Sequence, residues 1–292
     1  MTRYDLLLLS CTLLGWVSPM RAMQDVQNAS SGNQVRVFLN VSAKDGSPVA
    51  IEKSQLNVFI DKQPAQVIGL QPAKDEPLTF AVVVDISKSD AGGADALKRA
   101  VVQVFQSLSS SQHKGYLVVF NDLLAVSRAP VQAQDVQKML DGVKFGGGTA
   151  VYDAVERICT QELSRTKNPT LPRRAIILIS DGEDNASHIT RKKAEEIAEE
   201  QGVSVFSLQT RSSLAGPGGE QFLKDLSHNS GGQYINGKDV TEAVLPAVAA
   251  IDGQWALSLT PPQNRDHGLH SLTIKTSQKN IRLSAPPHIV VQ

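Results

Sequence analysis

Asp85, Ser87 and Ser89 are the residues whose types and spacing most clearly suggest chemistry, and they directly follow the apolar run 80–84. Such a run predicts a buried strand. Side chains at alternate positions of an extended segment point to the same side, so one carboxylate and two hydroxyls would meet at the carboxyl end of that strand. Hard oxygen ligands of this kind suit Mg²⁺, Mn²⁺ or Ca²⁺ rather than zinc. The segment taken alone also fits a helix-capping loop, because Asp and Ser are common there.

Two later segments add oxygen ligands. Three glycines and Thr149 precede a helical stretch at 150–153, and a second apolar run, 175–180, ends at Asp181. Together with the first segment, these residues resemble the von Willebrand factor A family. The metal-ion-dependent adhesion site of that family combines an Asp-x-Ser-x-Ser segment, a distant Thr and a distant Asp. The resemblance covers roughly residues 78–251.

The resemblance implies a role for each of these side chains. Ser87 and Ser89 would bind the ion directly through their hydroxyls, and Thr149 would bind it directly in at least one state. Asp85 and Asp181 would act mostly through coordinated water while supplying negative charge. Because few carboxylates touch the ion, it would keep positive character and take a Glu or Asp oxygen from a partner protein at its open position. Mg²⁺ fits such a site, with Mn²⁺ or Ca²⁺ as alternatives.

Three neighbouring residues are expected to shape the site rather than to bind the ion. Lys88 stands where the family often has a small residue, and strand alternation points it away from the ion, either into solvent or along the rim of the site. Asp184 resembles a family position and is expected to shape the loop after Asp181. Asp153 lies one helical turn beyond Thr149 and is expected to support that loop or the start of the helix.

Strand patterns that alternate with helical patterns over 78–251 must position these residues. We therefore expect an α/β fold with a doubly wound, mostly parallel, Rossmann-like sheet covered by helices on both faces. Ligands of such sheets bind at the carboxyl ends of the strands. Strands are predicted at 80–85, 114–120, 123–127, 174–180, 203–209 and 233–235, and helices at 94–108, 133–140, 151–163, 190–201, 220–228 and 240–251.

The flanking segments 34–77 and 252–292 alternate with period two instead, which is typical of half-buried strands. Three short strands at either end bury little core alone, so we expect both sets to pair into one small all-β domain that contains the α/β domain as an insertion. The alternative is that each set forms an independent flap. Strands are predicted at 34–41, 56–60, 66–70, 255–259, 269–276 and 281–284.

The amino terminus predicts export. Arg3, an apolar stretch at 6–17 and a following Pro-Met-Arg-Ala indicate a secretory signal peptide over 1–22, followed by a disordered leader over 23–33. The apolar stretch is too short for a membrane span, so no integral span is expected in the mature chain. The residues up to Cys11 also resemble a bacterial lipobox, and a buried N-terminal helix is a further alternative.

The second cysteine of the chain, Cys159, also supports export. Without the signal peptide, Cys159 has no disulfide partner and falls on the apolar face of a predicted helix, so we expect it to be a small core residue. A secreted chain without disulfides fits a bacterial envelope. We therefore expect a periplasmic, extracellular or envelope-associated protein, with lipid anchoring at Cys11 as the alternative.

Composition and motifs narrow the function. Lys plus Arg and Asp plus Glu both number 29, and no basic block stands out, which argues against nucleic acid as a partner. The chain has no His-Glu-x-x-His, Gly-x-Ser-x-Gly or P-loop pattern, so no enzymatic activity is expected. Two functions stay open. One is a metal-dependent protein-binding or adhesion module of the bacterial cell envelope, and the other is a structural scaffold whose metal site is vestigial or purely stabilising.

Overall fold

The computed structural model describes residues 34–44, 49–165, 173–210, 216–263 and 266–291. The predicted signal peptide, the leader and Cys11 lie outside the described residues. The fold lies within one compact unit, Val35–Gln292. Among the helices of the described residues, none has the length and apolar character needed to cross a membrane.

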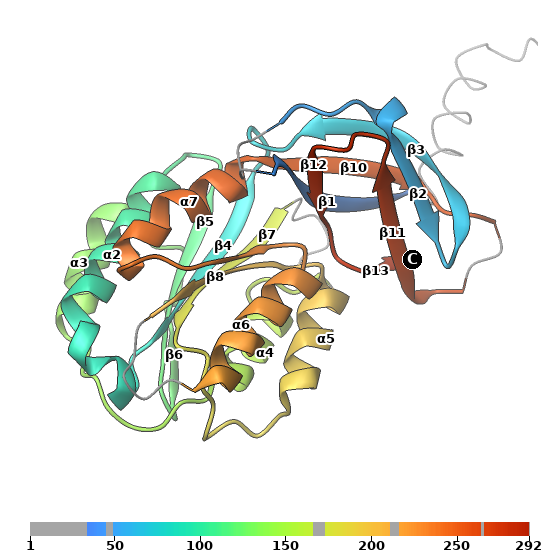
Figure 1. Cartoon of the computed structure of the whole chain (residues 1–292). Coiled ribbons are helices and arrows are strands. Elements are labelled where there is room, and N and C mark those ends of the chain that lie inside the picture. Colours follow the sequence, from blue (N-terminus) through green and yellow to red (C-terminus); the bar gives the residue numbers. More distant parts are fainter. Residues whose placement is uncertain (1–33, 45–48, 166–172, 211–215, 264–265, 292) are drawn as a thin grey trace, which may run out of the picture. The chain divides into compact units, whose positions relative to one another are not determined.

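A six-stranded sheet forms the centre of the α/β part, in the order β6-β5-β4-β7-β8-β9 (Figure 1). Neighbouring strands are parallel except at the edge, where β6 runs antiparallel to β5. The two central strands, β4 and β7, are buried along their whole length because both of their faces are apolar. This confirms the mostly parallel sheet. The strands are β4 (Leu78–Asp85), β5 (Lys114–Phe120), β6 (Leu124–Val126), β7 (Arg173–Ser180), β8 (Ser204–Gln209) and β9 (Gln233–Ile235).

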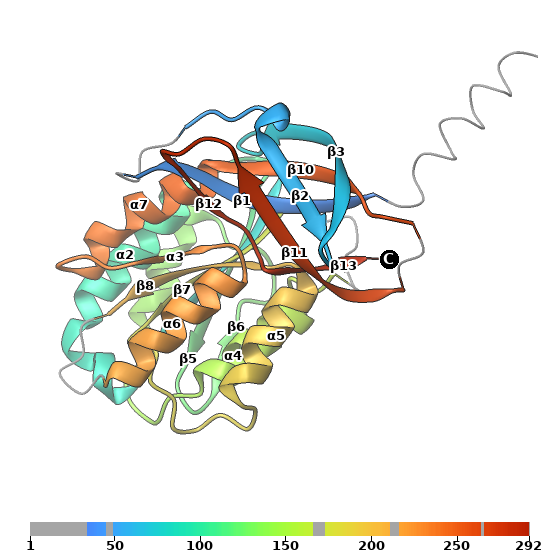
Figure 2. The same cartoon turned by 45° about the vertical axis from the view of Figure 1, so that its right-hand side comes forward.

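Helices cover both faces of this sheet, as expected (Figure 2). Alternate residues of β4 show why: Val82 and Val84 pack with α2, α3 and α7, whereas Ala81 and Val83 pack with α4, α5 and α6. Cys159 is buried between the sheet and the helices α4, α5 and α6, as expected for a small core residue. The helices are α2 (Ala94–Ser107), α3 (Ala133–Asp141), α4 (Val151–Thr160), α5 (Arg191–Gln201), α6 (Pro217–Asn229) and α7 (Val240–Asp252), with short 3-10 turns η1 (Lys53–Gln55) and η2 (Lys88–Gly93).

The flanking segments form a second, antiparallel sheet of seven strands in the order β12-β1-β10-β3-β2-β11-β13. Strands from the two ends of the chain are interleaved in this order, so the two sets share one core instead of forming separate flaps. One strand, β13, was not predicted from the sequence. The strands are β1 (Val35–Ala43), β2 (Leu56–Ile60), β3 (Gln63–Pro72), β10 (Gln254–Thr260), β11 (Gly268–Thr276), β12 (Ile281–Ser284) and β13 (His288–Val291).

Arg173, the first residue of β7, connects the two sheets although it is only 1% exposed. Its Nη1 donates to the carbonyl oxygen of Ala73 over 2.8 Å, and its Nη2 donates to that of Ile251 over 2.7 Å. A longer bond of 3.4 Å joins Nη2 to the side-chain oxygen of Gln254. These acceptors lie just beyond β3, near the end of α7 and at the start of β10, where the chain passes between the two sheets.

Candidate metal centre

Two neighbouring strands of the parallel sheet end in carboxylates. β4 ends at Asp85, β7 ends at Ser180, and the register pairs Val84 with Ile179. Asp85 and Asp181 therefore leave adjacent strand ends at the same edge of the sheet, where ligands of α/β sheets bind. Both side chains are buried, with exposures of 0% and 1%.

Asp85 is held from two directions. Its Oδ1 accepts a hydrogen bond of 2.9 Å from the amide of Ser87, and its Oδ2 accepts one of 2.7 Å from the hydroxyl of Ser180. The same Ser180 oxygen accepts a bond of 2.9 Å from the amide of Gly182. Ser180 thus ties the end of β4 to the loop after β7, and both oxygens of Asp85 already have a donor.

The hydroxyl oxygens of Ser87 and Ser89 lie 3.0 Å apart. The extended geometry expected here holds only in part, because β4 ends at Asp85 and η2 begins at Lys88. A tight turn, rather than continued strand alternation, brings the two hydroxyls together. Lys88 itself is exposed, in agreement with a solvated lysine.

The glycines before Thr149 lie against this turn. The amide of Gly146 donates to the carbonyl of Ile86 over 2.8 Å, and the amide of Lys88 donates to that of Gly147 over 3.4 Å. Gly147 has a φ of 84°, and a Cβ there would lie 2.2 Å from an oxygen of Asp122. Glycine is therefore required by both backbone conformation and space, and the loop can run close to the site.

Thr149, which is 4% exposed, is fastened to the loop that follows Asp181. Its amide donates to Oδ1 of Asn185 over 2.9 Å, and its carbonyl accepts from the amide of Asn185 over 3.0 Å. Asp184 accepts from the amide of Tyr152 over 3.2 Å, next to Thr149 at the start of α4. The structure thus brings the Thr149 loop and the Asp181 loop together through the backbone.

Asp184 lies in the loop after Asp181 and shapes it, as expected, whereas Asp153 also supports that loop rather than the Thr149 loop or the start of α4. Asp153 accepts hydrogen bonds of 2.9 and 3.1 Å from the amides of His188 and Ile189, and its Oδ2 lies 2.7 Å from Nδ1 of His188. The pKa of Asp153 is lowered: burial opposes the shift, and the hydrogen bonds from His188 and Ile189 outweigh it. Asp184 also accepts a bond of 2.6 Å from the hydroxyl of Ser187. Both carboxylates are occupied by the loop they support.

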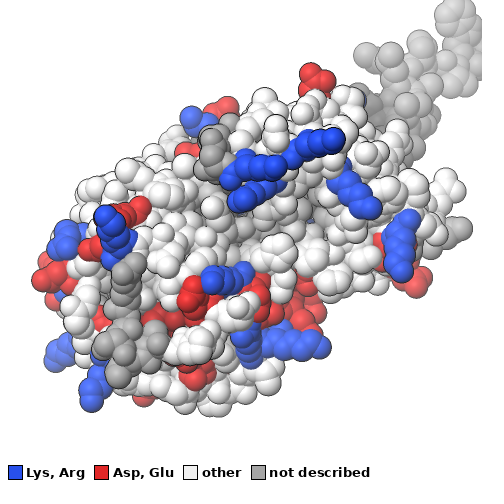
Figure 3. All heavy atoms as spheres, in the orientation of Figure 1, with Lys and Arg blue, Asp and Glu red and all other residues white. Residues whose placement is uncertain are grey.

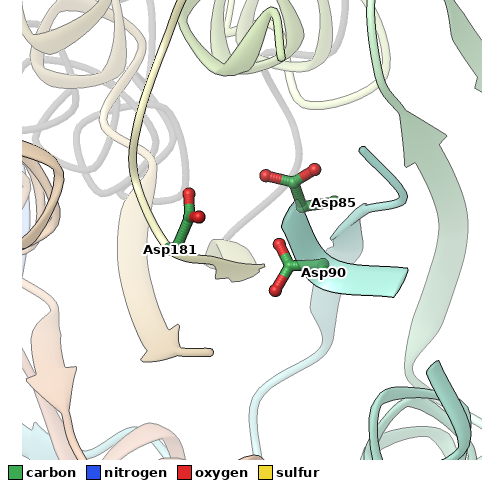
Figure 4. Close-up of side chains that lie close together, drawn as sticks. All are labelled: Asp85, Asp90 and Asp181. Carbon is green, nitrogen blue, oxygen red and sulfur yellow. The ribbon is translucent and has the colours of Figure 1, made fainter. Parts of the chain in front are cut away.

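A third carboxylate, that of Asp90, was missed by the sequence analysis. One carboxylate oxygen from each of Asp85, Asp90 and Asp181 lies within 4.8 Å of the others (Figure 4). Asp90 is 4% exposed and lies in η2, three residues after Ser87. Residues three apart share a side of a 3-10 turn. Recognising a tight turn after Asp85, in place of a longer strand, would have pointed to Asp90.

Burial and mutual repulsion raise the pKa of two of these carboxyls. Burial raises the pKa of Asp85 to about 6, against hydrogen bonds from Ser87 and Ser180, and the charge of Asp181 adds to the rise. Burial raises the pKa of Asp90 to about 8, and the charges of Asp85 and Asp181 contribute. A positive charge close to Asp85 and Asp90 would stabilise the ionised forms of these carboxyls.

The donor set fits a hard divalent cation. Oδ2 of Asp181 and Oδ2 of Asp90 are buried and have no hydrogen-bond partner among the described residues. Buried carboxylate oxygens without partners are costly, and such an oxygen is a preferred ligand of Mg²⁺, Mn²⁺ and Ca²⁺. Of the predicted ligands, Asp85 and Asp181 lie in the carboxylate cluster, Ser87 and Ser89 lie in the turn that follows Asp85, and the Thr149 amide is bonded to the loop that follows Asp181.

Comparisons with known proteins agree with this architecture. The sequence model of the von Willebrand factor type A domain matches residues 80–248. No curated protein matches the chain.

Solved structures also resemble the chain. A von Willebrand factor type A protein from Catenulispora acidiphila has a TM-score of 0.50 at 10% identity, covering 89% of this chain and 75% of that one. An aerotolerance-related membrane protein from Bacteroides fragilis has a TM-score of 0.48 at 17% identity, covering 60% and 98%. The manganese-loaded TRAP protein of Plasmodium vivax has a TM-score of 0.46 at 15% identity, covering 79% and 95%. The Catenulispora acidiphila structure is only 10% identical to this chain, so this similarity concerns the fold alone.

Proposed function

Because this chain belongs to the von Willebrand factor type A domain family, we propose that it is a metal-dependent protein-binding module of the bacterial cell envelope. A partner protein completes the coordination of a bound cation with a Glu or Asp carboxylate. The role is one of binding rather than catalysis. The cation is Mg²⁺, with Mn²⁺ or Ca²⁺ as alternatives, and its ligands are Asp85, Ser87, Ser89, Thr149 and Asp181.

One observation carries the proposal: Oδ2 of Asp181 is buried without a hydrogen-bond partner among the described residues. Its carboxylate lies within 4.8 Å of an oxygen of Asp85, beside the segment that carries Ser87. Leaving a carboxylate oxygen buried and unpaired costs free energy. A divalent cation at this edge of the sheet would offset that cost.

The hydrogen bonds around the site suggest which residues bind the ion and which ones orient the turn. Both oxygens of Asp85 are engaged by Ser87 and Ser180, which suits a carboxylate that contributes charge and orients the turn. The neutral hydroxyls of Ser87 and Ser89, which lie 3.0 Å apart, keep lone pairs that can bind the ion directly. When bound, the cation supplies a Lewis-acidic position for an anionic oxygen. The chain itself holds the turn of Ser87 and Ser89, the Thr149 loop and the Asp181 loop around that position.

The place of action is proposed from the predicted signal peptide over 1–22. Mass spectrometry of the mature amino terminus after expression in a bacterial host tests this part. Cleavage near Ala22 is expected. A diacylglyceryl group on Cys11 would instead indicate a lipid-anchored protein, and an intact Met1 would contradict export.

Cation-dependent capture of a partner tests the binding function. The full mature chain is immobilised and exposed to envelope extract in Mg²⁺ or in EDTA, and a captured protein is identified and produced in purified form. Binding of that protein is expected in Mg²⁺ and is expected to vanish in EDTA and in the variants Asp85→Ala and Ser87→Ala. Asp95→Ala is the matched control, because Asp95 is an exposed aspartate in the first turn of α2. It should bind like the wild type.

The opposite outcome would favour the scaffold function. Calorimetry with Mg²⁺ and Mn²⁺ on the wild type and on Asp181→Ala measures cation binding without any partner. If the wild type binds the cation and Asp181→Ala does not, while partner binding is the same in Mg²⁺ and EDTA, the metal only stabilises the fold. If neither protein binds a cation, the metal centre itself is refuted.

A further inference from the structure

We propose that Asp90 supplies a third carboxylate to the cation, from the inner side of the site, and thereby sets how strongly the cation attracts a partner carboxylate. This inference rests on the cation of the proposed function. It adds a residue to the five predicted ligands and assigns that residue a part in specificity.

The first argument is position. Asp90 lies in η2, in the same short segment as Asp85, while Asp181 comes from the end of β7. Figure 4 shows the carboxylates of Asp85 and Asp90 on one side and that of Asp181 across from them. The three oxygens within 4.8 Å of one another could all contact one cation or its bound water. Three carboxylates this close repel each other strongly unless a positive charge lies between them.

The second argument comes from a residue outside the acidic cluster. Thr210 directly follows β8, is 7% exposed, and its Oγ1 has no hydrogen-bond partner among the described residues. Thr210 and Asp90 line the same pocket. Two buried oxygens, Oδ2 of Asp90 and Oγ1 of Thr210, thus face the same region unsatisfied. Native proteins rarely leave such groups unpaired.

A pocket of about 190 Å³ lies next to Asp90 and Thr210. It is lined by Asp90, Thr210 and Leu97, by Val240 at the start of α7, and by Lys238, which precedes that helix. Lys238 is the basic residue of this lining, yet no ion pair joins it to Asp90 in the part of the chain that the structure describes. Lys238 therefore does not replace the cation as the counter-charge of Asp90.

The consequence concerns the charge that the cation retains. With Asp85 and Asp181 alone, two carboxylates would balance a divalent ion, whereas Asp90 adds a third negative charge next to it. Affinity for hard cations rises with the number of charged ligands. The same added charge reduces the attraction between the cation and a partner carboxylate. Asp90 therefore strengthens cation binding by the chain and moderates partner binding.

Calorimetry with Mn²⁺ on the full mature chain tests the inference. Asp90→Asn keeps the shape of the side chain and removes its charge, and it should weaken Mn²⁺ binding on the order of tenfold or more. Asp95→Asn is the matched control on an exposed aspartate and should bind Mn²⁺ like the wild type. Equal affinities for the wild type and Asp90→Asn would overturn the inference.

Thermal denaturation separates a ligand from a structural residue. In EDTA, Asp90→Asn should melt at the same temperature as the wild type or higher, because a repelling carboxylate has been removed. Saturating Mn²⁺ should raise its melting temperature less than that of the wild type. If Asp90→Asn instead melts lower in EDTA and its Mn²⁺-induced shift equals that of the wild type, Asp90 is only structural and the inference fails.

Acetate, used as a probe for the partner carboxylate, tests the second half. At saturating Mn²⁺, Asp90→Asn should bind acetate several-fold more tightly than the wild type, as measured by competition or by the electron paramagnetic resonance of Mn²⁺. Equal or weaker acetate binding would overturn this half. Failure of the proposed function has a different pattern: the wild type itself would not bind Mn²⁺, or Asp85→Ala would bind it unchanged.

Discussion

At its amino end, β7 buries Arg173; just beyond its carboxyl end, the chain buries Asp181. Burial lowers the pKa of Arg173, while the nearby Asp252 and Glu76 oppose that shift. The two ends differ in their partners. Arg173 donates through Nη1 and Nη2 to the carbonyls of Ala73 and Ile251, and only its Nε lacks a partner, whereas no group among the described residues bonds to Oδ2 of Asp181.

This difference separates a structural charge from a functional one. Arg173 donates to backbone carbonyls at the passage between the sheets, so its partners belong to the fold. Among the described residues, no ion pair joins Asp181, Asp90 or Asp85 to a basic side chain, and a bound cation would supply their counter-charge. Figure 3 shows acidic and basic side chains on the face drawn, as expected for a formal net charge of zero.

The largest effect is expected at Arg173. Arg173→Met keeps the apolar stem and removes the buried charged hydrogen bonds to the carbonyls of Ala73 and Ile251, so the free energy of unfolding should fall by about 3 kcal/mol. Urea denaturation should give the same loss in EDTA and in Mg²⁺, because the residue is remote from the cation. Arg157→Met is the control; Arg157 is 44% exposed and pairs with Glu162, so its loss should change stability by less than about 1 kcal/mol. If the loss of stability in Arg173→Met depended on Mg²⁺, Arg173 would not be purely structural, and the distinction between the two ends of β7 would fail.

The pH dependence of the cation-free protein is expected to be the next largest effect. The folded-state pKa of Asp85 is about 6 and that of Asp90 is about 8, both raised from 3.8. The folded state therefore holds these protons more tightly than the unfolded state. This contribution to stability is complete below pH 3.8 and is lost as the pH rises through about 6 and about 8.

Urea denaturation in EDTA and in saturating Mg²⁺ checks this from about pH 5 to about pH 8. The stability gained from Mg²⁺ should grow as the pH rises, because the cation compensates the charges that burial disfavours. In EDTA, Asp90→Asn should lose less stability than the wild type over the same range. A Mg²⁺ effect that is constant with pH would show that the carboxylates are not what the cation stabilises.

A smaller effect is expected at Ser180, whose hydroxyl donates to Asp85 and accepts from the amide of Gly182. Ser180→Ala should cost about 1–2 kcal/mol of stability and weaken Mn²⁺ binding, because Asp85 loses a donor that orients it. The matched control is Ser207→Ala, which removes a buried hydroxyl from the neighbouring strand β8 that bonds only to Ser227 over 2.9 Å. The control should lose similar stability in denaturation while Mn²⁺ calorimetry stays unchanged. Unchanged Mn²⁺ affinity in Ser180→Ala would place Asp85 outside the metal centre.

The smallest effect is expected at Asn185, whose Oδ1 accepts from the amide of Thr149. Asn185→Ala should cost about 1 kcal/mol and lower Mn²⁺ affinity only a few-fold, since the backbone bonds between the two loops persist. Asn229→Ala serves as the control, because Asn229 donates to Glu195 over 3.4 Å, away from the carboxylate cluster. If both variants change Mn²⁺ affinity equally, the placement of Thr149 by Asn185 does not matter to the site.

Much of the α/β fold could be predicted because hydrophobic periodicity is a property of short segments. The wholly apolar stretches of β4 and β7 and the apolar face of α2 indicated their conformation without knowledge of the rest of the chain. β13 escaped notice because its four residues follow two prolines and are too few to show a pattern. Its pairing with β11 supplies what the local sequence lacks.

The candidate site was predictable to a similar degree. Asp85, Ser87 and Ser89 are close in the chain, so their meeting was foreseen from spacing alone, although a turn rather than a strand brings the hydroxyls together. Thr149 and Asp181 needed the family resemblance, since nothing local connects them with Asp85. Asp90 was overlooked, because a charged residue in a turn is usually exposed to water and only the surrounding structure buries it.

The amino-acid sequence by itself determined which segments are strands and helices and which residue types stand at the strand ends, because backbone conformation and amphipathic spacing act over a few residues. Only the tertiary structure decided that strands from both ends of the chain are interleaved in one sheet, that Nη1 and Nη2 of Arg173 donate to carbonyls, and that Oδ2 of Asp90 lies near Asp181 with no hydrogen-bond partner among the described residues. Pairing, burial and the counter-charge of a buried group all depend on residues far apart in the chain, and their free energies are settled only when those residues meet.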